Sequence, residues 1–453
     1  MADDMEEDGY DGLENVHSDS SDDDYFDVEQ ELYLHDHEES QDEDSDNDED
    51  ETIDGEQKDK IKFDQSLPSS HTYLGEEMDE VTGRTVMEDD NIVCIPLLSL
   101  PNLLLVPGQT LPMHFFNPQI VAMMKNLLDK DNTFGVVTDS RGLVVNSEDD
   151  IKRITGTTCE IYSIREENEA GISTISIKAM ARRRFKVLSI RTQLDGTRIG
   201  SVRILPDVVV PAYPRNALAE CVRSSRLVTN HLQASRKLKF STRKKVVPSC
   251  SAWPCWVYEL YNPYLLIAKI KQELRSWNNN LKTDMLPTEA TEFSYWVTHN
   301  LPLDNNRRDS LLKMNCPIQR LRKQLEIMQK YGIMICDDCR TIIADKKDLF
   351  SMSLTGLMGA YVNPGGYVHE TVTFHKAKGL RLRGLSSTEH SWFPGYAWTI
   401  AECKHCGNHM GWKFTAVNKK LVPKKFWGLT RASLRPSLRQ EDDETQITAQ
   451  IEN

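Results

Sequence analysis

Cys336-Asp337-Asp338-Cys339 and Cys403-Lys404-His405-Cys406 are two Cys-x-x-Cys motifs separated by 63 residues. Each motif can bring two sulfur atoms to one ion from a tight turn, and two motifs complete a tetrahedral thiolate site with no position for water. A site of this kind contributes folding free energy and does no chemistry. We therefore predict one structural zinc ion that ties together distant parts of one domain, held by Cys336, Cys339, Cys403 and Cys406.

The sequence leaves three other uses of these cysteines open: a pair of disulfide bonds, a redox site, and chance spacing. The chain begins Met1-Ala2-Asp3-Asp4, without the basic start and apolar run of a secretory signal. We therefore expect a reducing compartment, where close cysteine pairs favour a metal over a disulfide. His405 and His409 are nearby alternative ligands. The other six cysteines lack metal spacing and are predicted to be free buried thiols: Cys94, Cys159, Cys221, Cys250, Cys255 and Cys316.

Aromatic residues gather between and after the two motifs. Trp392 and Trp398 flank the Pro394-Gly395 turn, which can fold the two indoles toward each other. In a strand, Trp412 and Phe414 point to the same face because side chains alternate. The pattern favours a box with three indole walls. Such a box suits a cation held by π faces or a flat neutral ring held by contact area, with its polar edge bonded to backbone near His390 and Trp392.

The alternative is a small β core in which tryptophan serves as filler. Against it, each indole N–H needs a hydrogen-bond partner when buried, and clusters beside Gly and Pro turns often form concave sites. Composition alone leaves both interpretations open.

The remaining chain divides by pattern into further segments. Residues 76–212 carry repeated β signals, with strands expected at 92–98, 103–106, 134–137 and 143–145, a helix at 117–130, and a hairpin turn at Asp195-Gly196. Residues 213–330 are predicted to be an α-helical bundle, including helices from Pro263 to about Leu281 and from Pro317 to Tyr331. Residues 331–436 return to a β pattern. The predicted fold class is α+β multidomain: a mainly β domain, a helical bundle and a zinc-bound all-β domain.

Charge is distributed very unevenly. Residues 1–60 hold 28 Asp and Glu against Lys58 and Lys60, a net −26, which leaves about +11 for the rest of the chain. We therefore predict that residues 1–75 form an acidic disordered arm and that residues 437–453 form a disordered tail. The mildly basic remainder suits an acidic protein partner and shows no nucleic-acid module. The sequence has no apolar run long enough to predict membrane insertion.

Together these residues resemble the cereblon family, whose members are substrate receptors of cullin–RING ubiquitin ligases. Upstream, Pro107–Pro112 and Arg182–Val187 are similar to the N-terminal substrate domain of Lon proteases, which the family shares, and Ser70–Gly75 also fits. The resemblance covers about residues 68–435. Its C-terminal part rests on the two cysteine motifs and on Asn363-Pro364, Gly366–Glu370, Ser387–Thr399, Gly411–Ala416 and Lys425–Arg431.

The resemblance implies a Lon N-terminal-like domain, a bundle that docks the ligase's β-propeller DNA-damage-binding adaptor, and a CULT-like zinc domain. This last domain would bind glutarimides, including thalidomide-type drugs, and C-terminal cyclic imides on proteins. The receptor itself would be no enzyme. It would act in cytoplasm and nucleus and present proteins for ubiquitination and proteasomal degradation. Trp392, Trp398 and Trp412 would form the walls and Phe414 the base, while His390 and the Trp392 backbone would bond the imide edge and Asn363 would lie at the rim.

Three departures from the family pattern stand out. Gly365 replaces a common histidine, which removes a side chain from the rim. Ile400 is bulkier than the valine of some members, and we hypothesise that it hinders drug-recruited proteins more than drug binding. Equal recruitment by the wild type and Ile400→Val would contradict this hypothesis. Residues 213–252 match poorly, so the resemblance assigns no individual adaptor contacts.

Three rival functions each require residues that can be sought in the sequence. An ATP-dependent Lon protease needs a Gly-x-x-x-x-Gly-Lys-Ser/Thr loop, which is absent. A methionine sulfoxide reductase needs a reactive cysteine near the pocket, yet no cysteine lies between Cys339 and Cys403 or after Cys406. A methyl-lysine reader would use the cage for a cation, with Glu389 as the carboxylate beside the tryptophans.

Overall fold

The computed structural model describes residues 60–75, 77–83, 86–139, 151, 153–169, 172–209, 260–278, 281 and 283–437. The predictions for residues 1–59, for a strand at 143–145, for residues 213–252 and for residues 438–453 lie outside these ranges. Among the helices described, none has the length and apolar character needed to cross a membrane.

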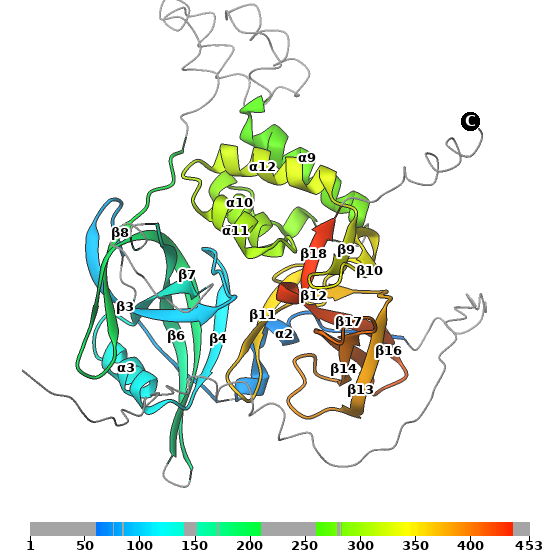
Figure 1. Ribbon diagram of the computed structural model, residues 1–453, viewed down its shortest axis with the longest axis horizontal. Coiled ribbons are helices and arrows are strands. Elements are labelled where there is room, and N and C mark those ends of the chain that lie inside the picture. The colour runs from blue at the N-terminus through cyan, green and yellow to red at the C-terminus, as the bar shows by residue number, and fades with distance from the viewer. Residues whose placement is uncertain are drawn as a thin grey trace, which may run out of the picture. The chain divides into compact units, whose positions relative to one another are not determined.

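The first sheet closes on itself. Its strands β6 (Thr155–Glu169), β5 (Thr133–Asp139), β3 (Ile92–Pro101), β8 (Arg198–Ile204) and β7 (Ile172–Thr192) pair in that order, and β7 pairs again with β6. This ring of pairings makes a barrel, drawn in blue to green in Figure 1. Two further strands extend it, β2 (Asp79–Glu80) on β6 and β4 (Thr110–Phe115) on β7.

A helix covers part of this barrel. α3 (Pro118–Leu128) begins where the Asn117 side chain caps it by accepting a hydrogen bond from the backbone N–H of Gln119. Met124 and Leu127 on its inner face pack with Phe134 and Ile177 of the barrel strands. The predicted helix and the turn at Asp195-Gly196 are confirmed, with Gly196 in the left-handed region at φ 83°.

The predicted strand at residues 103–106 is wrong. These residues are buried but belong to no strand, because side chains bond their backbone in place of a ladder. Thr138 and Thr157 donate to the carbonyls of Leu103 and Leu105, and Gln109 accepts from the Val106 N–H. Leu104 and Val106 pack with Tyr295 and Leu312, so the apolar run joins the barrel to the helices.

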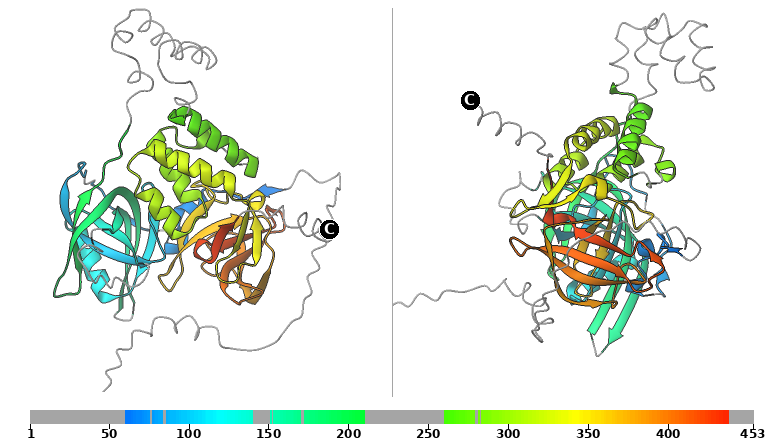
Figure 2. Two further views of the ribbon diagram at one scale, coloured as in Figure 1. Left: turned by 45° about the horizontal axis from the view of Figure 1, so that its top comes forward. Right: turned by 90° about the vertical axis from the view of Figure 1, so that its right-hand side faces the viewer.

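The helical segment contains α9 (Pro263–Trp277), α10 (Ala290–Asn300), α11 (Asn305–Leu312) and α12 (Pro317–Lys330). The Asn262 side chain caps α9 by accepting from the N–H groups of Tyr264 and Leu265. α9 ends at Trp277, earlier than the predicted Leu281, because Asn278 adopts an extended backbone. α9 and α12 pack side by side (Figure 2).

The C-terminal region contains two antiparallel sheets. The small sheet has the order β10 (Ile342–Asp345), β9 (Ile333–Cys336), β18 (Leu434–Ser437). The larger sheet has the order β11 (Met358–Val362), β12 (Val368–Phe374), β17 (Lys425–Thr430), β15 (His409–Ala416), β14 (Tyr396–Cys403), β13 (Leu380–Ser387). This confirms the predicted all-β C-terminal region, and β13 forms one edge of the larger sheet.

Residues 60–75 correct the predicted extent of the acidic arm. They form β1 (Ile61–Lys62), α2 (Leu67–Ser70) and a 3₁₀ turn (Thr72–Leu74). β1 pairs in parallel with β16 (Leu421–Val422), and the Phe63 ring packs against Phe393 and Tyr396. Sequence patterns did not reveal this contact because its two strands lie about 360 residues apart.

A buried ionic cluster joins segments from the whole described chain. Glu370 of β12 accepts two hydrogen bonds from Arg308 of α11, at 2.8 and 2.6 Å, and one from Arg431 at 2.8 Å. Gln109, beside β4, also donates to Glu370 at 3.3 Å. Arg308 and Arg431 compensate the burial of this carboxylate and hold the pKa of Glu370 down at about 2, although desolvation alone would raise it.

Of the six cysteines predicted to be free and buried, Cys221, Cys250 and Cys255 lie outside the described residues, and the other three are not all buried. Cys159 is buried, and desolvation raises the pKa of its thiol far above the ordinary value. Cys94 is exposed, because it lies on β3 at a position that faces outward.

Candidate functional site

The four predicted zinc ligands converge at one place. Cys336 ends β9 and Cys339 lies in the turn to β10, while Cys403 ends β14 and Cys406 lies in the turn to β15. All four sulfur atoms lie within 4.8 Å of one another. The site therefore joins the small sheet to the larger one, which is the linking role that the spacing predicted.

The distances fit a tetrahedral thiolate site. Zn–S bonds of about 2.3 Å place the sulfurs of a tetrahedron about 3.8 Å apart. The Sγ atoms of Cys336 and Cys406 are 3.7 Å apart, and those of Cys339 and Cys403 are 3.5 Å apart. Four cysteine sulfurs at these separations are the donor set of structural zinc, and the protein carries one such ion.

The two turns are built alike. Cys336 and Cys403 each donate their N–H across the hairpin, to the carbonyls of Thr341 and Asn408 at 2.8 Å. The residue after each second cysteine adopts a left-handed backbone and donates back to the carbonyl of the first cysteine: Arg340 at φ 67° and Gly407 at φ 78°. This shared geometry presents two sulfurs per turn.

The three predicted cage tryptophans lie on or against one face of the larger sheet. On β14 and β15, Trp398 pairs with Phe414 and Ile400 with Trp412, so these four side chains share a face. Trp392, from the loop between β13 and β14, meets Trp412 edge to face at a centroid distance of 4.7 Å. All three indoles pack with the same aromatic cluster.

The indoles differ in burial, which bears on the choice between a cage and a core. Trp392 is only 7% exposed, stacks on Tyr361 at 5.1 Å, and donates from Nε1 to the Val362 carbonyl. Trp398 and Trp412 are half-buried, and Trp398 donates to the Glu389 carbonyl at 2.8 Å. One wall is therefore a core residue, while the other two present indole surface to solvent.

Phe414 lies beneath these indoles. It is 2% exposed, stacks on Phe426 at 5.0 Å and meets Phe393 at 4.8 Å. The strand alternation predicted for Trp412 and Phe414 thus gives one half-exposed and one buried aromatic on the same face.

Two histidines contact this cluster that the sequence did not assign to it: His369, and His409, which was considered only as an alternative zinc ligand. His369 is 8% exposed, its ring lies 5.0 Å from Trp412 and 5.7 Å from Trp392, and neither ring nitrogen has a hydrogen-bond partner. Burial lowers the pKa of His369 to about 3, so its imidazole is neutral at physiological pH. His409 meets Trp412 at 4.9 Å. Side chains alternate along β12, so the sequence could have put His369 on the same face as the indoles. That assignment needs the pairing of β12 with β17, which the sequence does not reveal.

The loop from Thr388 to Gly395 carries His390. His390 is exposed with φ 50°, and its ring lies 3.6 Å from the Glu389 carboxylate. The loop is closed by a hydrogen bond from the Glu389 N–H to Ser387 Oγ and by one from the Tyr396 N–H to the Phe393 carbonyl. These bonds fix the backbone on either side of His390 and Trp392.

The predicted rim residue Asn363 lies in the hairpin turn between β11 and β12. Its side chain accepts from the Tyr367 N–H at 2.8 Å, and the preceding carbonyl, of Val362, accepts from Trp392. Asn363 is therefore one residue from a direct contact with the cage. At Gly365 an added Cβ would come no closer than 3.5 Å to Asn363, so the turn has room for a side chain there.

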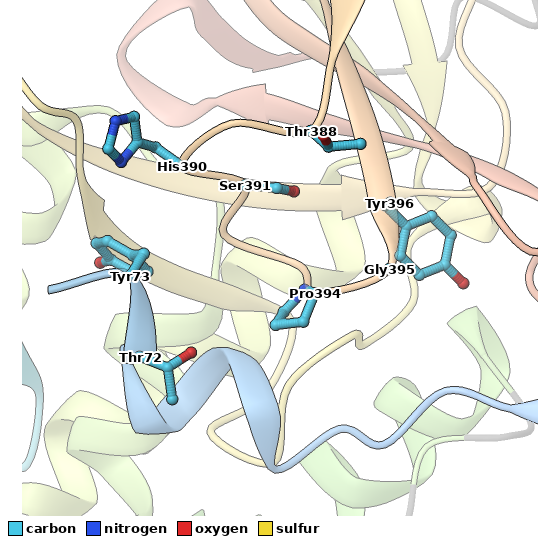
Figure 3. Close-up of a pocket in the computed structure, with 8 residues that line it drawn as sticks. All are labelled: Thr72, Tyr73, Thr388, His390, Ser391, Pro394, Gly395 and Tyr396. Atoms are coloured by element: carbon cyan, nitrogen blue, oxygen red, sulfur yellow. The ribbon is translucent and has the colours of Figure 1, made fainter. Parts of the chain in front are cut away.

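A surface pocket of about 350 Å³ lies beside the same loop. His390, Ser391 and Pro394 line one side, and Thr72 and Tyr73 of the N-terminal segment line the other (Figure 3). None of the three tryptophans lines it. Because no indole belongs to its lining, this pocket is distinct from the surface that Trp398 and Trp412 expose.

Two sequence families match the chain. Residues 94–330 match the substrate-binding domain of ATP-dependent protease La (Lon). Residues 333–448 match a family described as Yippee zinc-binding/DNA-binding/Mis18, centromere assembly. The second match spans all four cysteine ligands and the three tryptophans.

Full-length relatives also match. The protein named cereblon from Gallus gallus is 46% identical over 408 residues, covering 86% of this chain and 89% of the relative. The protein of that name from Danio rerio is 47% identical over 401 residues, covering 86% and 92%. That from Xenopus tropicalis is 46% identical over 403 residues, covering 86% and 89%.

Proposed function

This chain belongs to the cereblon family, and on that premise we propose that it is the non-catalytic substrate receptor of a cullin–RING ubiquitin ligase. It binds the cyclic imide of a glutarimide, either a thalidomide-type drug or a C-terminal cyclic imide on a protein. Bound proteins are presented for ubiquitination and proteasomal degradation, in cytoplasm and nucleus. The mechanism is geometric, because binding raises the effective concentration of the substrate near the ubiquitin-charged enzyme.

One observation carries the cyclic-imide proposal: Trp398 and Trp412 are half-buried on the face under which Phe414 is buried, with Trp392 against Trp412. A flat six-membered ring gains contact area from such walls. Its polar edge needs donors and acceptors, which the His390 side chain and the backbone of His390 and Trp392 supply from a loop fixed by its own hydrogen bonds.

The cation alternative finds less support. Glu389, the carboxylate nearest the tryptophans in sequence, has a side chain that is 81% exposed and lies 3.6 Å from His390. Glu370 lies beside His369 in sequence, but Arg308 and Arg431 already bind its carboxylate. Neither group adds negative charge to the walls.

The helical segment is the proposed docking site for a β-propeller adaptor. Three large apolar or aromatic residues are exposed at the start of α9. The exposed fractions are 38% for Leu260, 46% for Tyr261 and 72% for Tyr264. Exposed aromatic residues at the end of a bundle suit a protein interface. Affinity purification of the full chain should retain a propeller adaptor and a cullin, and absence of both would contradict this part of the proposal.

The direct test of ligand binding is the melting temperature of the full chain with and without a glutarimide. We expect the ligand to raise it, because a molecule that binds the native state stabilises it. Trp398→Ala should abolish the shift and leave the zinc content unchanged.

Trp427→Ala is the matched control. Trp427 is also half-buried in the larger sheet, but its neighbour Phe426 is paired with Phe414, so alternation puts Trp427 on the opposite face. This variant should keep the ligand-induced shift. A wild-type chain with bound zinc and no shift would overturn the cage assignment.

A further inference from the structure

Beyond the tryptophans, the cage face continues toward the edge of the sheet. Along β14, Trp398, Ile400 and Glu402 alternate onto this face. On the edge strand β13, Arg383 pairs with Ile400 and Arg381 pairs with Glu402. Because cross-strand partners share a face, both arginines stand on the side of the sheet that holds the indoles.

These three charged residues form a compact cluster. Arg381 donates from Nε and Nη2 to one oxygen of Glu402, at 3.1 and 2.9 Å, and Arg383 donates from Nη1 to the other at 3.0 Å. The Glu402 side chain is 8% exposed, whereas those of Arg381 and Arg383 are 58% and 63% exposed.

Counted without the neighbouring zinc site, the three side chains carry surplus positive charge. One carboxylate faces two guanidinium groups, so the cluster has a formal charge of +1 at neutral pH. Glu402 holds both side chains in place, and each guanidinium has five N–H donors, of which Arg383 directs one nitrogen at Glu402. Charged side chains on an edge strand also protect it from pairing with another chain. Within the cluster, Glu402 balances one of the two guanidinium charges.

The cluster also lies on the more exposed side of this face. Exposure rises across the face, from the buried Phe414 through the half-buried Trp398 and Ile400 to Arg383. Two residues along a strand span about 7 Å and neighbouring strands lie about 5 Å apart, so Arg383 is near the position where a chain attached to a caged ring emerges. Glu389, the other carboxylate near this face, is in the loop beside His390.

We propose that Arg381 and Arg383 form a carboxylate-binding subsite beside the cage, which selects proteins with Asp or Glu one to three residues before a C-terminal cyclic imide. This inference rests on the proposed function and names the substrate class within it. A guanidinium held by Glu402 can bind an incoming carboxylate with charge-assisted, bidentate hydrogen bonds. The subsite therefore adds charge selectivity to a cage that recognises only the terminal ring.

The test uses synthetic hexapeptides that end in a cyclised glutamine. Glu or Gln is placed at each of the three preceding positions, and affinity for the zinc-loaded full chain is measured by isothermal titration calorimetry. We expect the Glu peptide to bind about three- to tenfold more tightly than the Gln peptide at one position or more, in low salt. Raising the salt concentration should shrink the ratio, because both arginines are exposed.

Substitutions separate this subsite from the cage. Arg381→Gln with Arg383→Gln should bring the Glu/Gln ratio to about one and leave the affinity of a small glutarimide unchanged. The double variant leaves the buried Glu402 carboxylate without its two arginine partners, which lowers stability. Adding Glu402→Gln removes that buried charge, and the triple variant should show the same Glu/Gln ratio of about one. Lys413→Gln removes one positive charge from the opposite face, since Lys413 pairs with Thr399, and should preserve the ratio.

The outcomes distinguish the two levels of the proposal. A glutarimide that binds while Glu and Gln peptides bind equally at all three positions overturns the subsite alone. A Glu preference that survives in the triple variant also overturns it. Failure of both the small glutarimide and the peptides to bind the wild type overturns the proposed function, and the subsite with it.

Discussion

At the scale of single residues, several neutral histidines are built into the interior. His71, His299 and His369 are buried, and desolvation lowers the pKa of His71 and His369 to about 3 and that of His299 to about 4. An unfolded histidine has a pKa of about 6.5, so the unfolded chain binds protons that the folded chain excludes. Stability is therefore complete above pH 6.5 and is lost as the pH falls toward the folded-state values.

This linkage predicts acid sensitivity within a narrow range. Between pH 7.5 and 5.5 each of the three histidines should cost about 1.3 kcal/mol of the free energy of unfolding, so the melting temperature should fall steadily. His71→Phe removes one of the titrating groups and should reduce the fall. Thermal melts with the zinc content measured at each pH check the prediction, and a melting temperature that is flat over this range would contradict it.

Single residues also show where sequence reasoning reached its limit. The cysteine spacing and the helices at 117–130 and from Pro263 are local patterns, and the structure confirms them. Glu370, Arg308 and Arg431 are isolated charges with no periodic pattern, so nothing in the sequence indicated that they meet. The roles of His390, Asn363 and the three tryptophans in binding remain predictions, because the geometry gives their positions and not their ligand.

At the scale of elements, the hairpin of β11 and β12 contacts the barrel through a glycine. Gly366 has φ 81°, and a Cβ there would lie 2.7 Å from the carbonyl oxygen of His114 on β4. The neighbouring Gly365 has no such contact and no left-handed backbone. Only Gly366 therefore needs to be glycine, although the two are adjacent.

This contrast predicts different effects of the same substitution. Gly366→Ala should lower the free energy of unfolding by about 1–3 kcal/mol, because it adds backbone strain and a steric clash. Gly365→Ala should change it by less than about 0.5 kcal/mol. Chemical denaturation of both variants checks this prediction. Equal free energies of unfolding for Gly366→Ala and Gly365→Ala would show that the hairpin accommodates a Cβ at position 366 without losing stability.

The two zinc turns are the elements that connect the C-terminal sheets. Removing the ion with a chelator should unfold this region, because the site supplies on the order of 10 kcal/mol of binding free energy to the folded state. Far-UV circular dichroism should lose β signal in step with zinc release. Cys403→Ser should behave like the chelated chain and Cys94→Ser, at an exposed free thiol, like the wild type. An unchanged spectrum after complete removal would exclude a structural role.

At the scale of the whole described chain, contacts between segments far apart in the sequence hold the fold together, and local sequence patterns did not predict them. The sequence predicted three folded segments and their classes, but not how residues 60–75 cross to β16 or how the Leu103–Val106 run reaches the helices. Both contacts are made by apolar or backbone groups whose partners lie far away along the chain. Apolar residues that recur every two or 3.6 positions indicate which side of a strand or helix is buried. They do not indicate which other segment packs against that side.

We propose that Trp392, Trp398 and Trp412 bind a cyclic imide above Phe414. The chain has eight tryptophans, so its indole N–H resonances can be followed individually by nuclear magnetic resonance, with assignments from single Trp→Phe variants. Titration of the zinc-loaded chain with a glutarimide should shift the signals of these three indoles and leave those of Trp277, Trp296 and Trp427 in place. Unmoved signals of Trp392, Trp398 and Trp412 at a saturating ligand concentration, or shifts confined to the other tryptophans, would contradict this proposal.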